Sequence, residues 1–281
     1  MKRFLCLFLL LSFISCKDSH KEDPNKEVWV DLFNGENLDN WTPKFSNNTL
    51  GVNYNNRFQV SDSLLNVVYE VQDSFVGNFG HLYYKDKFSH YKLRATYRFH
   101  GEQQTNGPAW AYRNNGLMLH CQDPKTIAID QDFPLCLEAQ LLGGNGADER
   151  TTGNLCTPHT HVTMGSEIEK THCVNSNSKT YHGDGWQEAE VLVLGDSLIQ
   201  HFMEGEVVIE YHSPIVDVSL LGETSFIDGS KVDDGYISIQ AETAPISFKS
   251  IQLLDLCGCM DEKSTNYKSY YTKSDPSKCI F

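Results

Sequence analysis

Basic side chains, long apolar runs and helical periodicity are all scarce in this 281-residue chain. Lys and Arg number 23 against 37 Asp and Glu, which gives a formal net charge of −14 at pH 7. This charge repels a phosphate backbone and no basic stripe offsets it, so nucleic acid is excluded as a partner. Because no segment keeps helical spacing over a dozen residues, strands are the expected element.

The first 15 residues are predicted to be an export signal. Lys2 and Arg3 precede the apolar run at residues 4–14, which is too short to span a bilayer as a permanent helix. Ser15 and Cys16 resemble a bacterial lipobox, in which the thiol of Cys16 is acylated and begins the mature chain. Residues 16–27 lack large apolar side chains and are expected to be a flexible tether. We therefore expect a lipid-anchored protein of the cell envelope, on the periplasmic face or the outer-membrane surface. A plainly secreted protein is the alternative.

Seven of the nine cysteines remain once the signal is removed and Cys16 is acylated. No C-x-x-C pair indicates a structural zinc site, and an exported chain meets an oxidising compartment where disulfides are permitted. We expect the pairs Cys156–Cys173 and Cys259–Cys279, and the odd count leaves at least one thiol free. Cys121 and Cys136 are predicted to be small buried hydrophobic residues.

Residues 28–255 show a periodicity of two. In residues 91–99, Tyr, Leu, Ala, Tyr and Phe alternate strictly with Lys, Arg, Thr and Arg, as in a strand with one buried face. Glu204-Gly205 is typical of a tight hairpin turn. Further strands are expected at residues 64–71, 116–120, 135–142, 186–194, 198–203, 207–211, 236–240 and 246–254. With 40% hydrophobic residues, the chain is predicted to form an all-β sandwich of two antiparallel sheets.

Five short motifs, in order, resemble those of the bacterial 3-keto-disaccharide hydrolase family. They are LFNGENLDNW at residues 32–41, RNNGL at 113–117, LEAQLL at 137–142, TYHGDGW at 180–186 and GYISIQ at 235–240. The resemblance implies a concanavalin-A-like jelly roll over residues 28–256. It also implies an oligosaccharide or glycoside substrate that a partner sugar 3-dehydrogenase has already oxidised at C3.

The chemistry of such a substrate sets the requirements of the site. A ketone at C3 acidifies the hydrogen on C2, so a base can remove it and the group on C1 can leave by β-elimination. The site needs a base, a proton donor for the leaving group and a stabiliser for the enolate. The function expected is therefore that of a lyase or hydrolase acting on 3-keto-glycosides. A non-catalytic carbohydrate-binding protein, or a structural envelope lipoprotein, remains the alternative.

Strand alternation selects the catalytic candidates. In residues 135–142, Glu138 and Gln140 share a face opposite the apolar face. By the same rule, Asn114 and His120 share a face of the preceding strand, and we expect His120 to lie beside Glu138 as an acid/base partner. The alternative is an ordinary hydrogen-bonded pair with no catalytic role.

Other polar residues are candidates for the groove. His182 is expected to line it as a catalytic residue, and Arg113, together with Gln240, to bind substrate. Glu242 follows the closing strand and could also face the groove. His159 and His161 can share a face of an extended segment, which suits either substrate binding or a divalent metal ion. Spacing identifies no third ligand for such an ion. A divalent metal is therefore one option, and no cofactor is expected to be required.

Residues 257–281 resemble a small cysteine-containing module appended to many exported Bacteroidetes proteins. At about 25 residues it is too small for a core of its own, so the Cys259–Cys279 disulfide is expected to hold it together.

Overall fold

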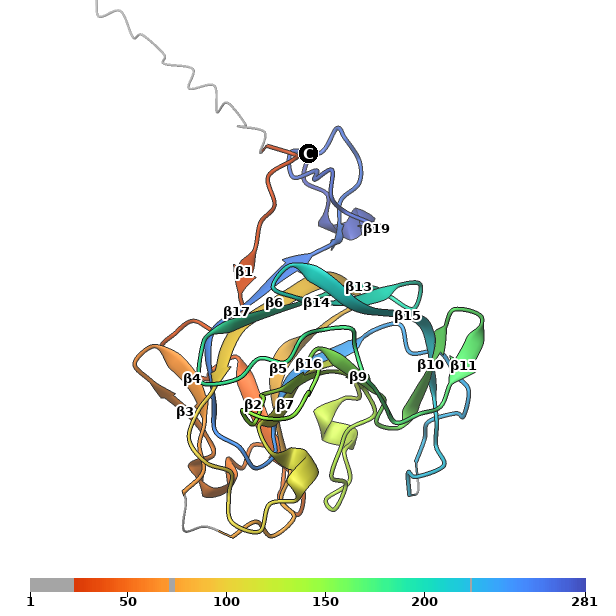
Figure 1. Ribbon diagram of the computed structural model, residues 1–281. Helices are drawn as coiled ribbons and strands as arrows, with labels where there is room; N and C mark the ends of the chain where they lie inside the picture. The colour runs from red at the N-terminus through yellow and green to blue at the C-terminus, as the bar shows by residue number, and fades with distance from the viewer. Residues whose placement is uncertain (1–22, 71–73, 223) are drawn as a thin grey trace, which may run out of the picture.

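The computed structural model describes residues 23–70, 74–222 and 224–281 and shows two antiparallel β-sheets packed face to face (Figure 1). The predicted signal at residues 1–15 and the lipid site at Cys16 lie outside these residues. The all-β jelly-roll sandwich expected from the sequence is confirmed, with a small module at the C-terminus.

The larger sheet has ten strands. Its order is β11-β10-β15-β14-β13-β6-β17-β4-β3, with β1 also paired to β17. The bounds are β1 Val30–Asp31, β3 Phe58–Ser61, β4 Leu64–Val67, β6 His90–Phe99, β10 Thr160–Met164, β11 Glu167–Glu169, β13 Gln187–Leu194, β14 Ile199–Met203, β15 Glu206–Val216 and β17 Ile246–Asp255.

The smaller sheet has seven strands and carries the candidate site. Its order is β12-β9-β8-β7-β16-β5-β2. The bounds are β2 Trp41–Phe45, β5 Gly80–Phe88, β7 Asn114–Cys121, β8 Leu137–Leu142, β9 Asn154–Cys156, β12 Cys173–Val174 and β16 Gly235–Ala241. Short 3-10 turns occur at η1 Tyr54–Asn56, η2 Ala109–Ala111, η3 Pro124–Thr126 and η4 Pro276–Lys278.

Alternation of apolar side chains builds the core between the sheets. β6 is buried at every second residue along its whole length, as its sequence predicts. β8 turns Leu137, Ala139 and Leu141 into the same core, which leaves Glu138 and Gln140 on the outer face of the smaller sheet. The predicted hairpin turn is also present, since Glu204 and Gly205 both have positive φ.

The LFNGENLDNW motif has a structural role. Leu32 and Trp41 are buried in the core, and the Trp41 indole N–H donates to the Leu32 carbonyl at 3.0 Å. Between them, the Asn34 side chain accepts from the backbone N–H groups of Glu36 and Asn37 at 2.9 Å, forming an Asx turn. The motif therefore connects β1 of the larger sheet to β2 of the smaller sheet and packs into the core between them.

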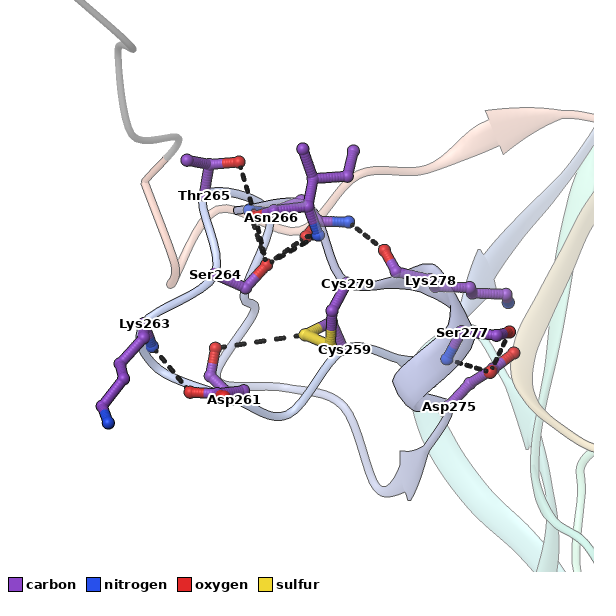
Figure 2. The surroundings of a disulfide bond; sticks show 11 residues. Cys259, Asp261, Lys263, Ser264, Thr265, Asn266, Asp275, Ser277, Lys278 and Cys279 are labelled. Atoms are coloured by element: carbon purple, nitrogen blue, oxygen red, sulfur yellow. Dashed lines mark hydrogen bonds between the residues drawn. A yellow bond between two sulfur atoms is a disulfide. The ribbon is translucent and has the colours of Figure 1, made fainter.

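Both predicted disulfides are confirmed. Cys156 and Cys173 are joined between the neighbouring strands β9 and β12. Cys259 and Cys279 join the two ends of the C-terminal module, where Asn266 donates to the Lys278 carbonyl at 2.8 Å (Figure 2). Of the seven cysteines in the described residues, three are free thiols: Cys121, Cys136 and Cys257.

The C-terminal module contacts the first described residues of the chain. Its parallel pair β18 Cys257–Gly258 and β19 Lys273–Ser274 lies where the N-terminal segment enters the fold (Figure 1). Ser269 N–H donates to the Pro24 carbonyl at 2.9 Å, and the Lys268 ammonium donates to the Asp23 carbonyl at 3.1 Å. Residues 23–25 of the expected tether are therefore held against the module. No helix in the described chain is long and apolar enough to cross a membrane.

Candidate active site

A cavity of about 510 Å³ lies over the outer face of the smaller sheet. We call it the Glu138 cavity. Strands β7 and β8 form its floor, and loops before and after them form its walls. Its lining residues are Trp110, Asn114, Phe133, Glu138, Gln140, Leu142, Arg150, Cys156, Pro158, His172, Cys173 and Glu242.

Glu138 lies at the centre of the floor. It stands opposite Met118 of β7, and its carboxyl group folds over Gly116, where a Cβ atom would lie 2.6 Å from Glu138 Cγ. A side chain at residue 116 would therefore collide with Glu138 unless the carboxyl group moved. Burial raises the pKa of Glu138 to about 8, because the charged form loses its water.

Glu242 is a second buried carboxyl group in the same cavity. It follows β16, which is the neighbour of β7 on the side away from β8. Burial, and then the charge of Glu138, raise the pKa of Glu242 well above its ordinary value, and the Arg150 guanidinium opposes this shift. Two carboxyl groups that influence each other in this way ionise at different pH values. The suggestion from the sequence that Glu242 faces the groove is confirmed.

Amide side chains surround the two carboxyl groups. Asn114 and Gln140 line the cavity, and Gln140 accepts from Asn154 at 3.1 Å. Gln240 lies on the same outer face, opposite His81 of β5, but it is buried beside the cavity and is not among its lining residues. Burial lowers the pKa of His81 to about 3, so this ring is neutral. The buried oxygens that lack a hydrogen-bond partner in the described residues include Glu138 Oε1, Glu242 Oε2, Asn114 Oδ1 and Gln240 Oε1.

Aromatic side chains form one wall. Trp110 is 54% exposed although it lines the cavity, and it stacks on Phe79 with ring centroids 5.8 Å apart. Phe133 packs against the same Phe79 at 4.8 Å. Exposed aromatic faces beside polar groups suit the binding of sugar rings, which have apolar faces and polar edges.

Arg150 braces this wall from a loop between β8 and β9. Its guanidinium donates to the carbonyl oxygens of Trp110 at 3.0 Å and Gly143 at 2.9 Å, and also to that of Tyr112. It thus fixes the loop that carries Trp110 while placing a positive charge near Glu242.

The prediction that His120 lies beside Glu138 is wrong. A β-bulge sets Leu119 and His120 together opposite Ile237, and His120 takes a positive φ of 51°. The bulge breaks the alternation, so the His120 ring turns to the other face of the sheet. There its Nε2 lies 3.2 Å from the Gly195 carbonyl oxygen and the ring packs on Tyr91.

His182 and Arg113 also lie away from the cavity lining. His182 Nδ1 accepts from the Gly146 N–H at 3.0 Å, which ties two loops together. Arg113 donates to Asp184 at 2.7 Å and to the Gly183 carbonyl at 2.8 Å. The RNNGL and TYHGDGW motifs therefore connect to each other, and these two residues support the loops near the cavity.

His159 and His161 line an adjacent cavity of about 320 Å³, which we call the histidine cavity. His161 Nε2 pairs with Asp217 Oδ2 at 3.4 Å. In the parts of the chain that the structure describes, no three His, Cys, Asp or Glu side chains are grouped to hold a metal ion.

Sequence reasoning missed Arg150, Trp110, Phe133 and His172. All four lie outside the strands, on segments with no periodicity to say which way a side chain points. An arginine and aromatic residues in the loops that flank a polar strand face are the signals that could have indicated them.

Comparison with known proteins identifies a family for the chain. The model of the 3-keto-alpha-glucoside-1,2-lyase-like domain matches residues 28–254. No curated protein matches the chain.

Several solved structures are similar to this chain at low identity. A candidate glycosyl hydrolase from Parabacteroides distasonis is 17% identical with a TM-score of 0.49, covering 81% of this chain and 99% of that chain. The laminarinase from Rhodothermus marinus is 7% identical with a TM-score of 0.45, covering 82% and 97%. Carbohydrate binding module CBM66 from Bacillus subtilis is 9% identical with a TM-score of 0.36, covering 65% and 90%. At these values, none of the three says what this chain does.

Proposed function

The chain belongs to the 3-keto-alpha-glucoside-1,2-lyase-like family, which is carbohydrate-active, and from this premise we propose that it cleaves 3-keto-glycosides in the Glu138 cavity. The observation that carries the proposal is the pair of buried carboxyl groups, Glu138 and Glu242, in one cavity. Elimination next to a ketone needs one group to take a proton and one to give a proton, and such a pair supplies both.

The environments of the two groups assign the roles. The pKa of Glu138 is raised by burial alone, whereas that of Glu242 is raised further by the charge of Glu138. Because one carboxyl group of a coupled pair holds its proton while the other is ionised, we assign the base to Glu138 and the acid to Glu242.

The reaction proceeds in two steps. The Glu138 carboxylate takes the hydrogen from C2, and the electrons of that bond form the enolate between C2 and C3. The enolate then collapses, a double bond forms between C1 and C2, and the C1–O bond breaks as Glu242 gives its proton to the leaving oxygen. The amides of Asn114 and Gln140 supply N–H donors for the C3 oxygen. Addition of water to the product would complete hydrolysis.

The proposal includes the setting of the reaction. A 3-keto-glycoside must come from a sugar 3-dehydrogenase, because the cavity residues supply no group that oxidises an alcohol. We place the protein in the cell envelope, held by lipid on Cys16. The motif at residues 1–16 supports this placement, and membrane fractionation of Cys16→Ala tests it.

The decisive experiment compares a 3-keto-glycoside with the same glycoside unoxidised. We expect cleavage only of the 3-keto form, and a fall of about 100-fold or more in kcat for Glu138→Gln and for Glu242→Gln, with binding retained. Cleavage of the unoxidised glycoside would instead indicate an ordinary glycosidase using the same two carboxyl groups.

One observation favours a second candidate, a non-catalytic carbohydrate-binding protein. Trp110 offers an exposed aromatic face at the cavity, as binding modules do. This candidate predicts that the wild-type protein binds sugars through Trp110 but leaves both forms of the glycoside intact.

A further inference from the structure

The Glu138 cavity continues into two others. It shares Phe133, Pro158 and His172 with the histidine cavity. The histidine cavity in turn shares Phe133, His159 and Leu220 with a third cavity of about 690 Å³, which we call the outer cavity. The three cavities are therefore adjacent to one another, and Phe133 lines all of them.

The histidine cavity has the chemistry of a hydroxyl-binding site. Burial lowers the pKa of His159 and that of His172, so these rings are neutral at pH 7 and can donate or accept hydrogen bonds. Lys170 and Asp217 line the same cavity with opposite charges. Phe133 and Leu220 add apolar surface on which a ring face can rest.

Acidic and neutral polar side chains line the outer cavity. Asp130 and Asp132 line it, and the chain as a whole carries a formal charge of −14. Gln122 and Gln131 add neutral polar groups, and Leu220, which is 84% exposed, adds apolar surface. A uronic-acid or sulfated sugar would be repelled here, whereas an uncharged sugar would not.

We infer that the substrate is an uncharged oligosaccharide of at least three sugar units, an inference that rests on the proposed function. The 3-keto unit occupies the Glu138 cavity, the sugar that leaves occupies the histidine cavity, and the next unit occupies the outer cavity. The groove thus selects the length of the leaving chain as well as the oxidised sugar.

The test uses 3-keto derivatives of the maltose and cellobiose series, each from disaccharide to tetrasaccharide. In the preferred series we expect kcat/KM to rise about tenfold from disaccharide to trisaccharide and then to level off, because remote contacts contribute to transition-state binding. The unoxidised sugars should show the same length dependence in calorimetric affinity.

Ala128→Trp provides the structural control. Ala128 is exposed and lines the outer cavity, so a Trp there should fill it and abolish the gain from the third unit. Ile129→Trp is the matched control, because Ile129 is 52% exposed and is not among the lining residues described for the groove. Leu220→Ser should reduce trisaccharide kcat/KM about fivefold through lost apolar contact.

The outcomes separate the two proposals. Equal kcat/KM and equal affinity for disaccharide and trisaccharide in both series, or a length effect that survives Ala128→Trp, would overturn the inference. Length-dependent binding without cleavage of any 3-keto sugar would support the groove and refute the proposed function.

Discussion

The contact between Gly116 and Glu138 gives the sharpest single-residue test of the site. Gly116→Ala would place a Cβ atom 2.6 Å from Glu138 Cγ and 2.8 Å from Cδ, whereas ordinary contacts begin at 3.4 Å. The Glu138 side chain is the flexible partner, so the strand should keep its place while the carboxyl group moves by ~1 Å. Displacement on this scale costs about 100-fold in rate when the moved group reacts with substrate.

The assay is steady-state turnover of a 3-keto-glycoside, with thermal unfolding measured in parallel. We expect kcat to fall about 100-fold while the melting temperature changes by only a few degrees. Gly185→Ala is the matched control, because no atom outside its two chain neighbours lies within 4 Å of a Cβ there. If Gly116→Ala kept full activity with Glu138 shown to be displaced, Glu138 would not be the base. A variant that failed to fold would show that the strand cannot accept the Cβ atom, contrary to this reasoning.

Three other predictions follow from the same structure. For pH, kcat/KM should fall about tenfold per unit below pH 8 as Glu138 gains its proton, and the profile should lose this limb in Glu138→Gln. Since the folded protein holds that proton more tightly than the unfolded chain, the contribution of Glu138 to the free energy of unfolding should decrease as pH rises from about 4.5 to 8, which denaturant titration of the wild type against Glu138→Gln can follow. Replacing His120 with Ala should lower the melting temperature, because the contacts to Gly195 and Tyr91 are lost, and should leave kcat nearly unchanged. A 100-fold loss of kcat would make His120 a catalytic candidate again. The double substitution Cys259→Ser and Cys279→Ser should lower the stability of the C-terminal module by about 2–4 kcal/mol. Proteolysis after residue 256 should then be faster than in the wild type, and an equal rate would contradict this prediction.

Several features could be read from local sequence. β6 alternates without interruption, and its burial follows that alternation residue by residue. The face of Glu138 and Gln140 was predictable for the same reason, because β8 is regular and its other face is apolar. The two disulfides were also predicted correctly.

Alternation fails where the backbone is irregular. His120 was assigned to the wrong face because one extra residue in β7 shifts every later side chain, and no local pattern marks that bulge. His182 and Arg113 belong to family motifs, yet their hydrogen bonds hold loops together. A motif shows that a residue matters to the fold or to the reaction without saying which.

By itself, the sequence determined the two-sheet architecture, the orientation of Glu138 and the family resemblance, because these depend on side-chain periodicity and on short contiguous motifs. Only the tertiary structure decided that Glu242 would join Glu138, since β16 lies next to β7 in the sheet although it is distant along the chain. It also decided that Trp110, Phe133 and Arg150 would wall the same cavity. The pKa values of both carboxyl groups follow from that assembly, because desolvation and charge coupling exist only once loops and strands from distant parts of the chain enclose them.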